Sequence, residues 1–403
     1  MNSKINDINF KQDFDYFINA GSKLNMGFNI IKHTTTPGSI EAEGGSNIQT
    51  KIIPDKNSIE SALYVEHEFK ILNNLNINYG FRLSDLSVIG PGNFYSYNAA
   101  GSPIDTLIAT NNQVVKSYFN IEPRFALNFK LNDQNSIKIA YSKQVQNLHL
   151  LTNSNSVNPT DTWVASSINI TPEITNEFAL GYYLNSKNNT FEFSVETYYK
   201  NLQNQIDYKP GAQLRVNDNV ESELIYGGVG RAYGIEFLYR KKTGKLNGWI
   251  GYTLSRTEKK FEQVNNNQYY PIRQDRTHEI SIVAIYEINQ KWSFSTTFQY
   301  YTGNAVSFPS GKYLINNLPQ SYYGDRNQNR YPSYNRMDIS FTYQPINRKN
   351  KKMKSSWNFG VYNVLFAENP IFISFVTGNN NLPSEAKNTY LFPIPAITWN
   401  FKF

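Results

Sequence analysis

Short and long connections alternate between the strand-like segments of this chain, and that pattern most constrains its fold. Polar and apolar residues alternate with a period of two over about fifteen segments, without a long helical pattern. In one segment, Phe119, Ile121 and Phe125 alternate with Asn120 and Glu122. Such alternation places the two kinds of side chain on opposite faces of a strand.

The alternating segments predict fifteen strands, each long enough for a tilted strand to cross a bilayer, which takes about 9–11 residues. The predicted strands lie near residues 5–18, 22–33, 58–69, 74–88, 115–130, 135–147, 174–186, 189–207, 231–243, 246–258, 275–288, 291–303, 335–346, 354–365 and 390–403.

The predicted connections fall into two length classes. The short ones are 19–21, 70–73, 131–134, 187–188, 243–245 and 289–290, and the long ones are 34–57, 89–114, 148–173, 208–230, 259–274, 304–334 and 366–389. A soluble sandwich has no reason to sort its connections in this way, whereas outer-membrane barrels have short periplasmic turns and long extracellular loops. A propeller would repeat a signature about every 40–50 residues, and no such repeat is present. We therefore predict an all-β, transmembrane antiparallel β-barrel.

The composition agrees with this interpretation. No stretch approaches the ~18 apolar residues of a transmembrane helix, and a mean hydropathy of −0.52 suits strands that are polar on one face. The absence of cysteine excludes disulfides, thiolate metal ligands and a thiol nucleophile. The net charge of +7 comes from scattered Lys and Arg, so nucleic acid is not an expected partner.

The last segment ends the chain with an alternating aromatic strand. Ile397, Trp399, Phe401 and Phe403 are expected to face lipid, with Phe403 in the periplasm and all seven long loops outside. A C-terminal aromatic of this kind resembles the signal by which the barrel-assembly machinery recognises its substrates. Lipid-facing aromatics of an interfacial girdle would look the same, and the two roles are compatible.

Several segments in order resemble the barrel of TonB-dependent outer-membrane receptors. They are ITNEFALGYY at 174–183 followed by FSVETYYKNL at 193–202, GVGRAYGIEF at 228–237 followed by KTGKLNGWIGYTLSR at 242–256, RQDRTHE at 273–279, and YNRMD at 334–338 with YNV at 362–364. No one motif is specific, but the resemblance covers essentially the whole chain. Within these motifs, Gly244 suits a tight turn, Gly230 and Gly234 permit close backbone approach, and Arg276, Glu279 and Asp338 are expected to point inward.

The resemblance implies a 22-stranded barrel with a signal peptide, a coupling motif and a plug. None of the last three is recognisable here, and an odd number of strands would close with a parallel pair. We therefore expect residues 1–403 to be a single domain, the last fifteen strands of such a barrel without its plug, and the chain to be a fragment of a longer protein.

The implied function is TonB-dependent uptake of a siderophore, cobalamin, glycan or peptide across the Gram-negative outer membrane. A passive, porin-like channel is the alternative, and an outer-membrane enzyme or adhesin is a third class. The implied partners are outer-membrane lipid and lipopolysaccharide, the barrel-assembly machinery, the TonB complex acting through the missing N-terminal part, and a surface lipoprotein.

No catalytic, cofactor-binding or metal-binding residues are predicted, because the four histidines are scattered and no nucleophile motif occurs. The loops rich in Tyr and Asn give candidate ligand contacts at Phe94, Tyr95, Tyr97, Tyr322 and Tyr323. The segment 325–329 faintly resembles a calcium loop, but without the glycine and the distal glutamate it is interpreted as a solvated loop.

Overall fold

The computed structural model describes residues 2–40, 51–52, 54–98, 101–151, 162–212, 220–316, 318–345, 354–377, 383–390 and 392–402. Strands dominate these residues, and the helical segments among them are the short 3-10 turns Val220–Glu223 and Asn265–Asn267. No helix in this part of the chain is long and apolar enough to cross a membrane.

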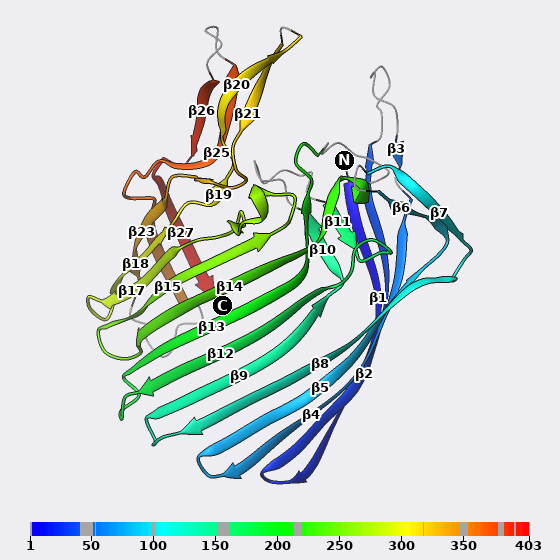
Figure 1. Cartoon of the computed structure of the whole chain (residues 1–403). Coiled ribbons are helices and arrows are strands. Elements are labelled where there is room, and N and C mark those ends of the chain that lie inside the picture. The colour runs from blue at the N-terminus through cyan, green and yellow to red at the C-terminus, as the bar shows by residue number, and fades with distance from the viewer. Residues whose placement is uncertain are drawn as a thin grey trace.

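One antiparallel sheet of seventeen strands forms the body of the molecule (Figure 1). Its long strands are β1 (Asn2–Asn19), β2 (Ser22–Ile40), β4 (Lys56–Leu72), β5 (Leu75–Ile89), β8 (Val114–Lys130), β9 (Asn135–Gln146), β12 (Glu173–Asn185), β13 (Phe191–Tyr208), β14 (Leu224–Lys241), β15 (Leu246–Lys260), β17 (His278–Glu287), β18 (Trp292–Tyr301), β23 (Tyr334–Tyr343), β24 (Lys354–Tyr362) and β27 (Ile394–Lys402). The two-residue strands β3 (Lys51–Ile52) and β16 (Tyr270–Pro271) complete it. All fifteen predicted strands are confirmed.

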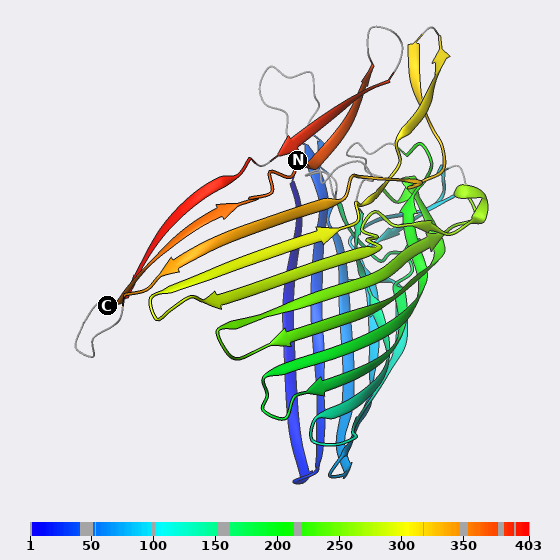
Figure 2. The same ribbon diagram turned by 90° about the vertical axis from the view of Figure 1, so that its left-hand side faces the viewer.

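Each long strand pairs antiparallel with the next long strand in the sequence, which gives a curved wall. Among the described residues, β1 pairs only with β2 and β27 only with β24, so these two strands are the edges of the sheet. Figure 2 shows the two edges standing apart on the open side of the wall.

The two faces of the wall are inverted relative to a soluble protein. On β8, Phe119 is 64% exposed, whereas Glu122 is 5% exposed. The Glu122 carboxylate accepts a hydrogen bond of 2.6 Å from Ser84 Oγ and lies 3.7 Å from Arg82 on β5. Apolar side chains therefore cover the convex surface and charged ones meet on the concave surface. This is the arrangement of a wall that faces lipid outside and a polar lumen inside.

Short turns join the strands at one end of the wall, and local polar side chains fix several of them. Asn132 Oδ1 accepts hydrogen bonds of 2.9 Å from the amides of Gln134 and Asn135. At another turn, Ser186 Oγ accepts hydrogen bonds from the amides of Thr190 and Phe191 at 2.8 and 3.0 Å. Asn and Ser favour turns because their side chains can bond to the backbone nearby.

Two glycines have the roles that the sequence predicted. Gly244 adopts a φ of +95° in the turn between β14 and β15, a conformation that other residues rarely tolerate. At Gly234 a Cβ atom would lie 2.9 Å from the carbonyl oxygen of Leu254 and 3.0 Å from the Tyr198 hydroxyl. A side chain at Gly234 would therefore collide with the neighbouring strands.

The long connections lie at the opposite end of the wall, at the top of Figure 1. The sequence predicted them only as loops, but most contain hairpins. The paired strands are β6 (Gly92–Tyr97) with β7 (Pro103–Ala109), β10 (Leu148–Leu151) with β11 (Thr162–Ala165), β19 (Ala305–Val306) with β22 (Asn329–Arg330), β20 (Pro309–Ile315) with β21 (Leu318–Tyr323), and β25 (Asn369–Thr377) with β26 (Pro383–Tyr390). We call these two ends the short-turn end and the long-loop end.

The inverted faces generate a prediction for two neighbouring residues of β12. Leu180→Arg should destabilise the protein in lipid vesicles by about 2–4 kcal/mol, because it places a charge on the lipid face near mid-strand. Ala179→Arg points into the lumen and should have a much smaller effect. Urea titrations followed by the heat-dependent mobility of the folded barrel would measure both. Equal effects, or a harmless Leu180→Arg, would contradict the assignment of the faces.

Candidate binding cavity at the long-loop end

A cavity of about 760 Å³ opens at the long-loop end. The loops 148–173, 208–230, 259–274 and 304–334 form its walls, together with the adjoining ends of β12, β13 and β15. Its lining combines polar and apolar side chains and contains both charge signs, with His149, Glu173, Asp207, Lys259 and Arg326 among the contributors. Its volume lies within the range of about 300–1,000 Å³ that is typical of ligand pockets.

Arg326 joins three of the four loops. Its guanidinium lies 3.1 Å from Asp207 Oδ2 and donates a hydrogen bond of 2.8 Å to the carbonyl oxygen of Tyr208. The backbone amide of Arg326 donates to Asn265 Oδ1 at 2.7 Å, and Asn265 Nδ2 donates back to the Arg326 carbonyl oxygen at 3.0 Å. Loop 304–334 is thereby fixed to loops 208–230 and 259–274.

Tyr270 completes this wall from β16. Its hydroxyl donates a hydrogen bond of 2.6 Å to Asp207 Oδ2. Burial, and next to it the negative charge of Asp207, raise the pKa of Tyr270 well above its ordinary value. The hydroxyl therefore remains protonated and keeps donating to Asp207 over the physiological pH range.

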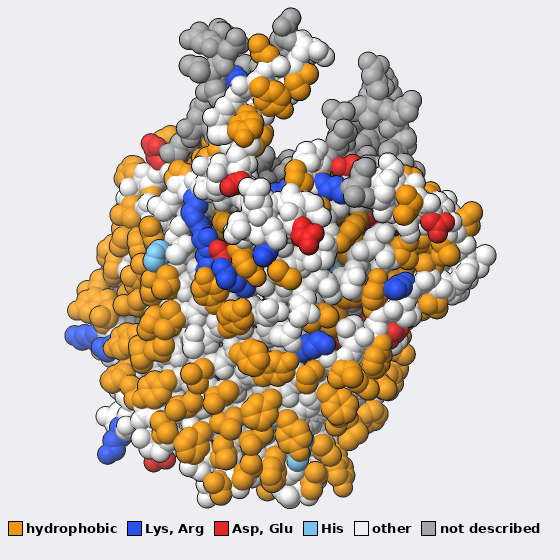
Figure 3. Space-filling view, viewed as in Figure 1, with side chains coloured by type: hydrophobic (Ala, Val, Ile, Leu, Met, Phe, Trp, Pro, Cys, Tyr) orange, Lys and Arg blue, Asp and Glu red, His pale blue; other side chains and the backbone are white. Residues whose placement is uncertain are grey.

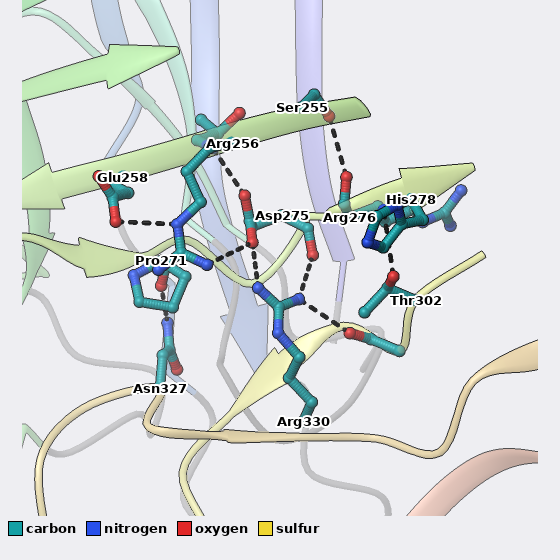
Figure 4. Close-up of polar contacts among 12 residues, drawn as sticks. Ser255, Arg256, Glu258, Pro271, Asp275, Arg276, His278, Thr302, Asn327 and Arg330 are labelled. Carbon is teal, nitrogen blue, oxygen red and sulfur yellow. Dashed lines mark hydrogen bonds and ion pairs between the residues drawn. The ribbon is translucent and has the colours of Figure 1, made fainter. Parts of the chain in front are cut away.

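A buried carboxylate, Asp275, is not part of the cavity lining but contacts residues at the ends of the same loops (Figure 4). Its side chain is 0% exposed and is paired with the guanidinium groups of Arg330 and, at 3.4 Å, Arg256. Asp275 Oδ1 also accepts a hydrogen bond of 2.6 Å from the amide of Thr257. Arg330 in turn donates to the carbonyl oxygens of Asp275 and Gly303 at 2.9 and 3.1 Å. The ends of loops 259–274 and 304–334 therefore share one ion-pair cluster.

The β10–β11 hairpin forms another part of the cavity wall and contributes His149, which is buried. His149 Nε2 lies 3.0 Å from Ser166 Oγ, and His149 Nδ1 lies 3.6 Å from Glu173 Oε1, too far for a direct hydrogen bond. Lys259 donates a hydrogen bond of 3.2 Å to the carbonyl oxygen of Ile206. A small apolar core supports this wall and consists of Leu151, Val164, Ile170, Ile206 and Leu224.

The candidate ligand contacts predicted from the sequence do not lie together. Of these five residues, only Tyr323 lines the large cavity, and Tyr322 is exposed on the β20–β21 hairpin. Phe94, Tyr95 and Tyr97 line a smaller cavity of about 50 Å³ behind the β10–β11 hairpin. Burial, with the nearby Glu221 charge, raises the pKa of Tyr97 to about 12. A ligand-binding role for the five stays a prediction.

Three of the four residues of the predicted assembly signal lie on β27. Ile397, Trp399 and Phe401 are exposed on the convex face, and the Trp399 ring stacks on Trp357 of β24 with centroids 5.5 Å apart. Phe403 lies outside the described residues. Their role in barrel assembly stays a prediction.

Arg276, Glu279 and Asp338 were expected to point inward. By strand register, Glu279 and Asp338 lie on the concave face, opposite to the apolar Ile280 and Met337. Arg276 lies 3.8 Å from the centroid of the Tyr301 ring, and Tyr301 is on the concave face of β18 beside Glu279. The side chains of Glu279 and Asp338 thus line the lumen as predicted.

The interpretation of 325–329 as a solvated loop holds for only part of the segment, because Asp325 and Gln328 are exposed but Asn327, which lies between them, is not. Asn327 is buried, and its Nδ2 donates a hydrogen bond of 2.9 Å to the carbonyl oxygen of Pro271. Together with Arg326 and Arg330, it makes this segment the link between loops. The contacts of Arg326 span 61 and 118 residues along the chain, so no local pattern could have predicted them.

Comparison with known proteins identifies this lumen-and-loop architecture. A family model described as "TonB dependent receptor-like, beta-barrel" matches residues 2–364. The chain therefore belongs to the TonB-dependent receptor family, whose members are outer-membrane β-barrels. No curated protein matches the sequence.

Solved structures show the same fold at low sequence identity. The ferric-catecholate import receptor Fiu from E. coli K12 is 12% identical with a TM-score of 0.59, covering 99% of this chain and 55% of its own. The ferripyoverdine receptor of the Pseudomonas aeruginosa outer membrane is 12% identical with a TM-score of 0.57, and the match covers 99% of this chain and 48% of the receptor. The ferric citrate transporter FecA is 13% identical with a TM-score of 0.62, and the match covers 99% of this chain and 54% of the transporter. The chain thus spans about half the length of these structures, which are receptors and transporters.

The Asp275 cluster generates the next prediction. Arg330→Ala should loosen loops 259–274 and 304–334, because breaking a buried ion pair costs about 3–5 kcal/mol when one charge stays buried. Asp275 keeps Arg256, so the lower part of this range applies. Hydrogen exchange measured by mass spectrometry should show faster exchange in both loops. Arg240→Ala, which breaks an exposed pair with Glu192 at the short-turn end, is the matched control. Unchanged exchange in Arg330→Ala would refute the linking role of the cluster.

Proposed function

We propose that residues 1–403 form the C-terminal part of the barrel of a TonB-dependent outer-membrane receptor, and that this receptor imports a nutrient actively. The open edges of β1 and β27 support the first point. Unpaired backbone groups are costly in hydrocarbon, so further strands of a longer chain would pair with them. The coverage of about half of each solved receptor agrees with this.

The cavity at the long-loop end carries the functional proposal. Four loops enclose it above the lumen of a lipid-facing wall, and ion pairs and amide hydrogen bonds hold those loops in place. A pre-formed cavity captures a scarce solute without first having to order its walls. In this proposal the cavity faces the exterior, and the solute passes into the lumen when the TonB complex remodels a plug.

The lining of the cavity indicates the general chemistry of the cargo. Tyrosines, amides and charges of both signs suit a polar molecule with several hydrogen-bonding groups. The structurally similar receptors include importers of ferric catecholate, ferripyoverdine and ferric citrate, so ferric chelates are the first cargo to test. Cobalamin, glycans and peptides are the other candidates.

Energy dependence separates active uptake from the alternative, a passive channel. Cells that express the full-length protein in place of their own iron receptors would be supplied with radioactive ferric citrate and ferric catecholate. Active uptake predicts accumulation that a protonophore or loss of TonB abolishes. Accumulation that persists without either would establish the passive channel. If neither chelate is taken up but cobalamin or a glycan is, the proposed cargo class would be wrong, whereas the proposal of active uptake would stand.

The orientation has its own test, because the chain contains no cysteine. Gln263→Cys at the cavity mouth should react with a membrane-impermeant maleimide on intact cells. Asn188→Cys, in the exposed turn between β12 and β13, should react only after the outer membrane is permeabilised. The reverse pattern would contradict the proposed orientation.

A further inference from the structure

A group of basic side chains lies on the convex face of the wall, near the long-loop end of β14 and β15. Its members are Arg231, Arg256 and Lys260, which we call the outer basic patch. Figure 3 shows Lys and Arg side chains gathered over the upper ends of these strands, above a largely apolar surface. Arg256 also pairs with Asp275 in the cluster described above, whereas Arg231 and Lys260 have no part in the cavity or the lumen described so far.

Strand register places the patch on the outside. Arg231 and Tyr233 alternate along β14 with lumen-facing residues, and they share their face with the lipid-facing Phe237 and Tyr239. Across the sheet, Tyr233 pairs with Arg256, and Arg231 pairs with Glu258. Lys260 pairs with Val229, which lies on the same face and is exposed.

The patch lies where the apolar surface ends. One row of cross-strand partners on β9, β12, β13 and β14 is aromatic and consists of Tyr141, Phe178, Tyr199 and Tyr233. The next row toward the long-loop end is polar and consists of Lys143, Asn176, Asn201 and Arg231. Rows two residues apart along a strand are about 7 Å apart. Such a sharp change from aromatic to polar is typical of the interface between hydrocarbon and headgroups.

The acidic partners of the patch are buried. The side chains of Arg231 and Arg256 are 36% and 33% exposed, whereas that of Glu258 is 8% exposed, and Asp275 is fully buried. Lys260 makes no ion pair within the described part of the chain. With Arg330, four cations face two carboxylates, so the cluster keeps a positive excess and presents it outward.

An exposed aromatic ring shapes the surface of the patch. The Arg231 guanidinium lies 4.1 Å from the centroid of the Tyr269 ring, and Lys260 Nζ lies 5.6 Å from the same centroid. Tyr269 comes from loop 259–274 and is partly exposed. Two cations are thus held on one ring by cation–π attraction, with nitrogen atoms left to contact a ligand.

We propose that the outer basic patch binds the phosphate groups of a glycolipid in the outer leaflet. Guanidinium and ammonium groups are the usual protein partners of phosphate, and the aromatic row below the patch would contact the acyl chains of the same lipid. The continuity of the patch with the lipid-facing surface favours a lipid over free phosphate. This proposal rests on the orientation given under the proposed function.

The test uses the full-length protein in phosphatidylcholine nanodiscs and diphosphorylated lipid A as the probe, with bound lipid measured by native mass spectrometry. The double variant Arg231→Gln and Lys260→Gln should bind lipid A about tenfold more weakly, since each cation near an anionic headgroup contributes to affinity. Lipid A without its phosphates should bind weakly to the original protein and to the variant alike. Lys260→Gln alone is a milder second variant, because it breaks no ion pair among the described residues.

The matched control is the double variant Lys241→Gln and Lys245→Gln, which removes the same charge at the short-turn end of the same hairpin. It should bind lipid A like the original protein. Equal weakening by both double variants, equal binding of dephosphorylated lipid, or no effect of the patch variants would overturn the proposal. The labelling of Gln263→Cys and the uptake of chelate are measured separately. Failure of the lipid-binding proposal can therefore be distinguished from failure of the proposed orientation or uptake function.

Discussion

In the hydrocarbon of a membrane, each backbone amide and carbonyl group must find its partner within the protein. The continuous antiparallel sheet from β1 to β27 meets this requirement, because every long strand between these two pairs with a neighbour on both sides. The same requirement makes its two edges the least satisfied part of the molecule. It also explains why irregular backbone is confined to the two ends of the wall, where water can satisfy the remaining groups.

Once the backbone is fixed as strands, the period-two alternation decides what each face contacts. Exposed Phe119 and buried Glu122 are three positions apart on β8, and neither placement is stable in a water-soluble sheet of this kind. Lipid removes the cost of exposing Phe119, while Ser84 and Arg82 satisfy Glu122 in the lumen. Half of every strand can then be polar, which accounts for the low mean hydropathy of a membrane protein.

The strands and the side of the sheet that each residue faces were predictable because both depend on local periodicity. Turn residues such as Gly244 were predictable because their role is also local: the turn needs a positive φ angle, which glycine adopts readily. The cavity was not predictable. Arg326 bonds to Asn265 and Tyr208, which are distant in sequence, and nothing in the loop composition marks these pairs. Aromatic loop residues such as Phe94 and Tyr322 were predicted to contact a ligand, whereas the contacts that join the loops come from charged and amide side chains.

Asp275 connects the outer basic patch with the wall of the cavity. One of its partners, Arg256, belongs to the outer basic patch, and the other, Arg330, belongs to the loop that closes the cavity. A carboxylate with no exposure cannot lose either partner cheaply, because its charge would remain in a poorly solvated site. Arg256 of the outer basic patch and Arg330 of the cavity loop therefore belong to one ion-pair cluster around a single buried carboxylate.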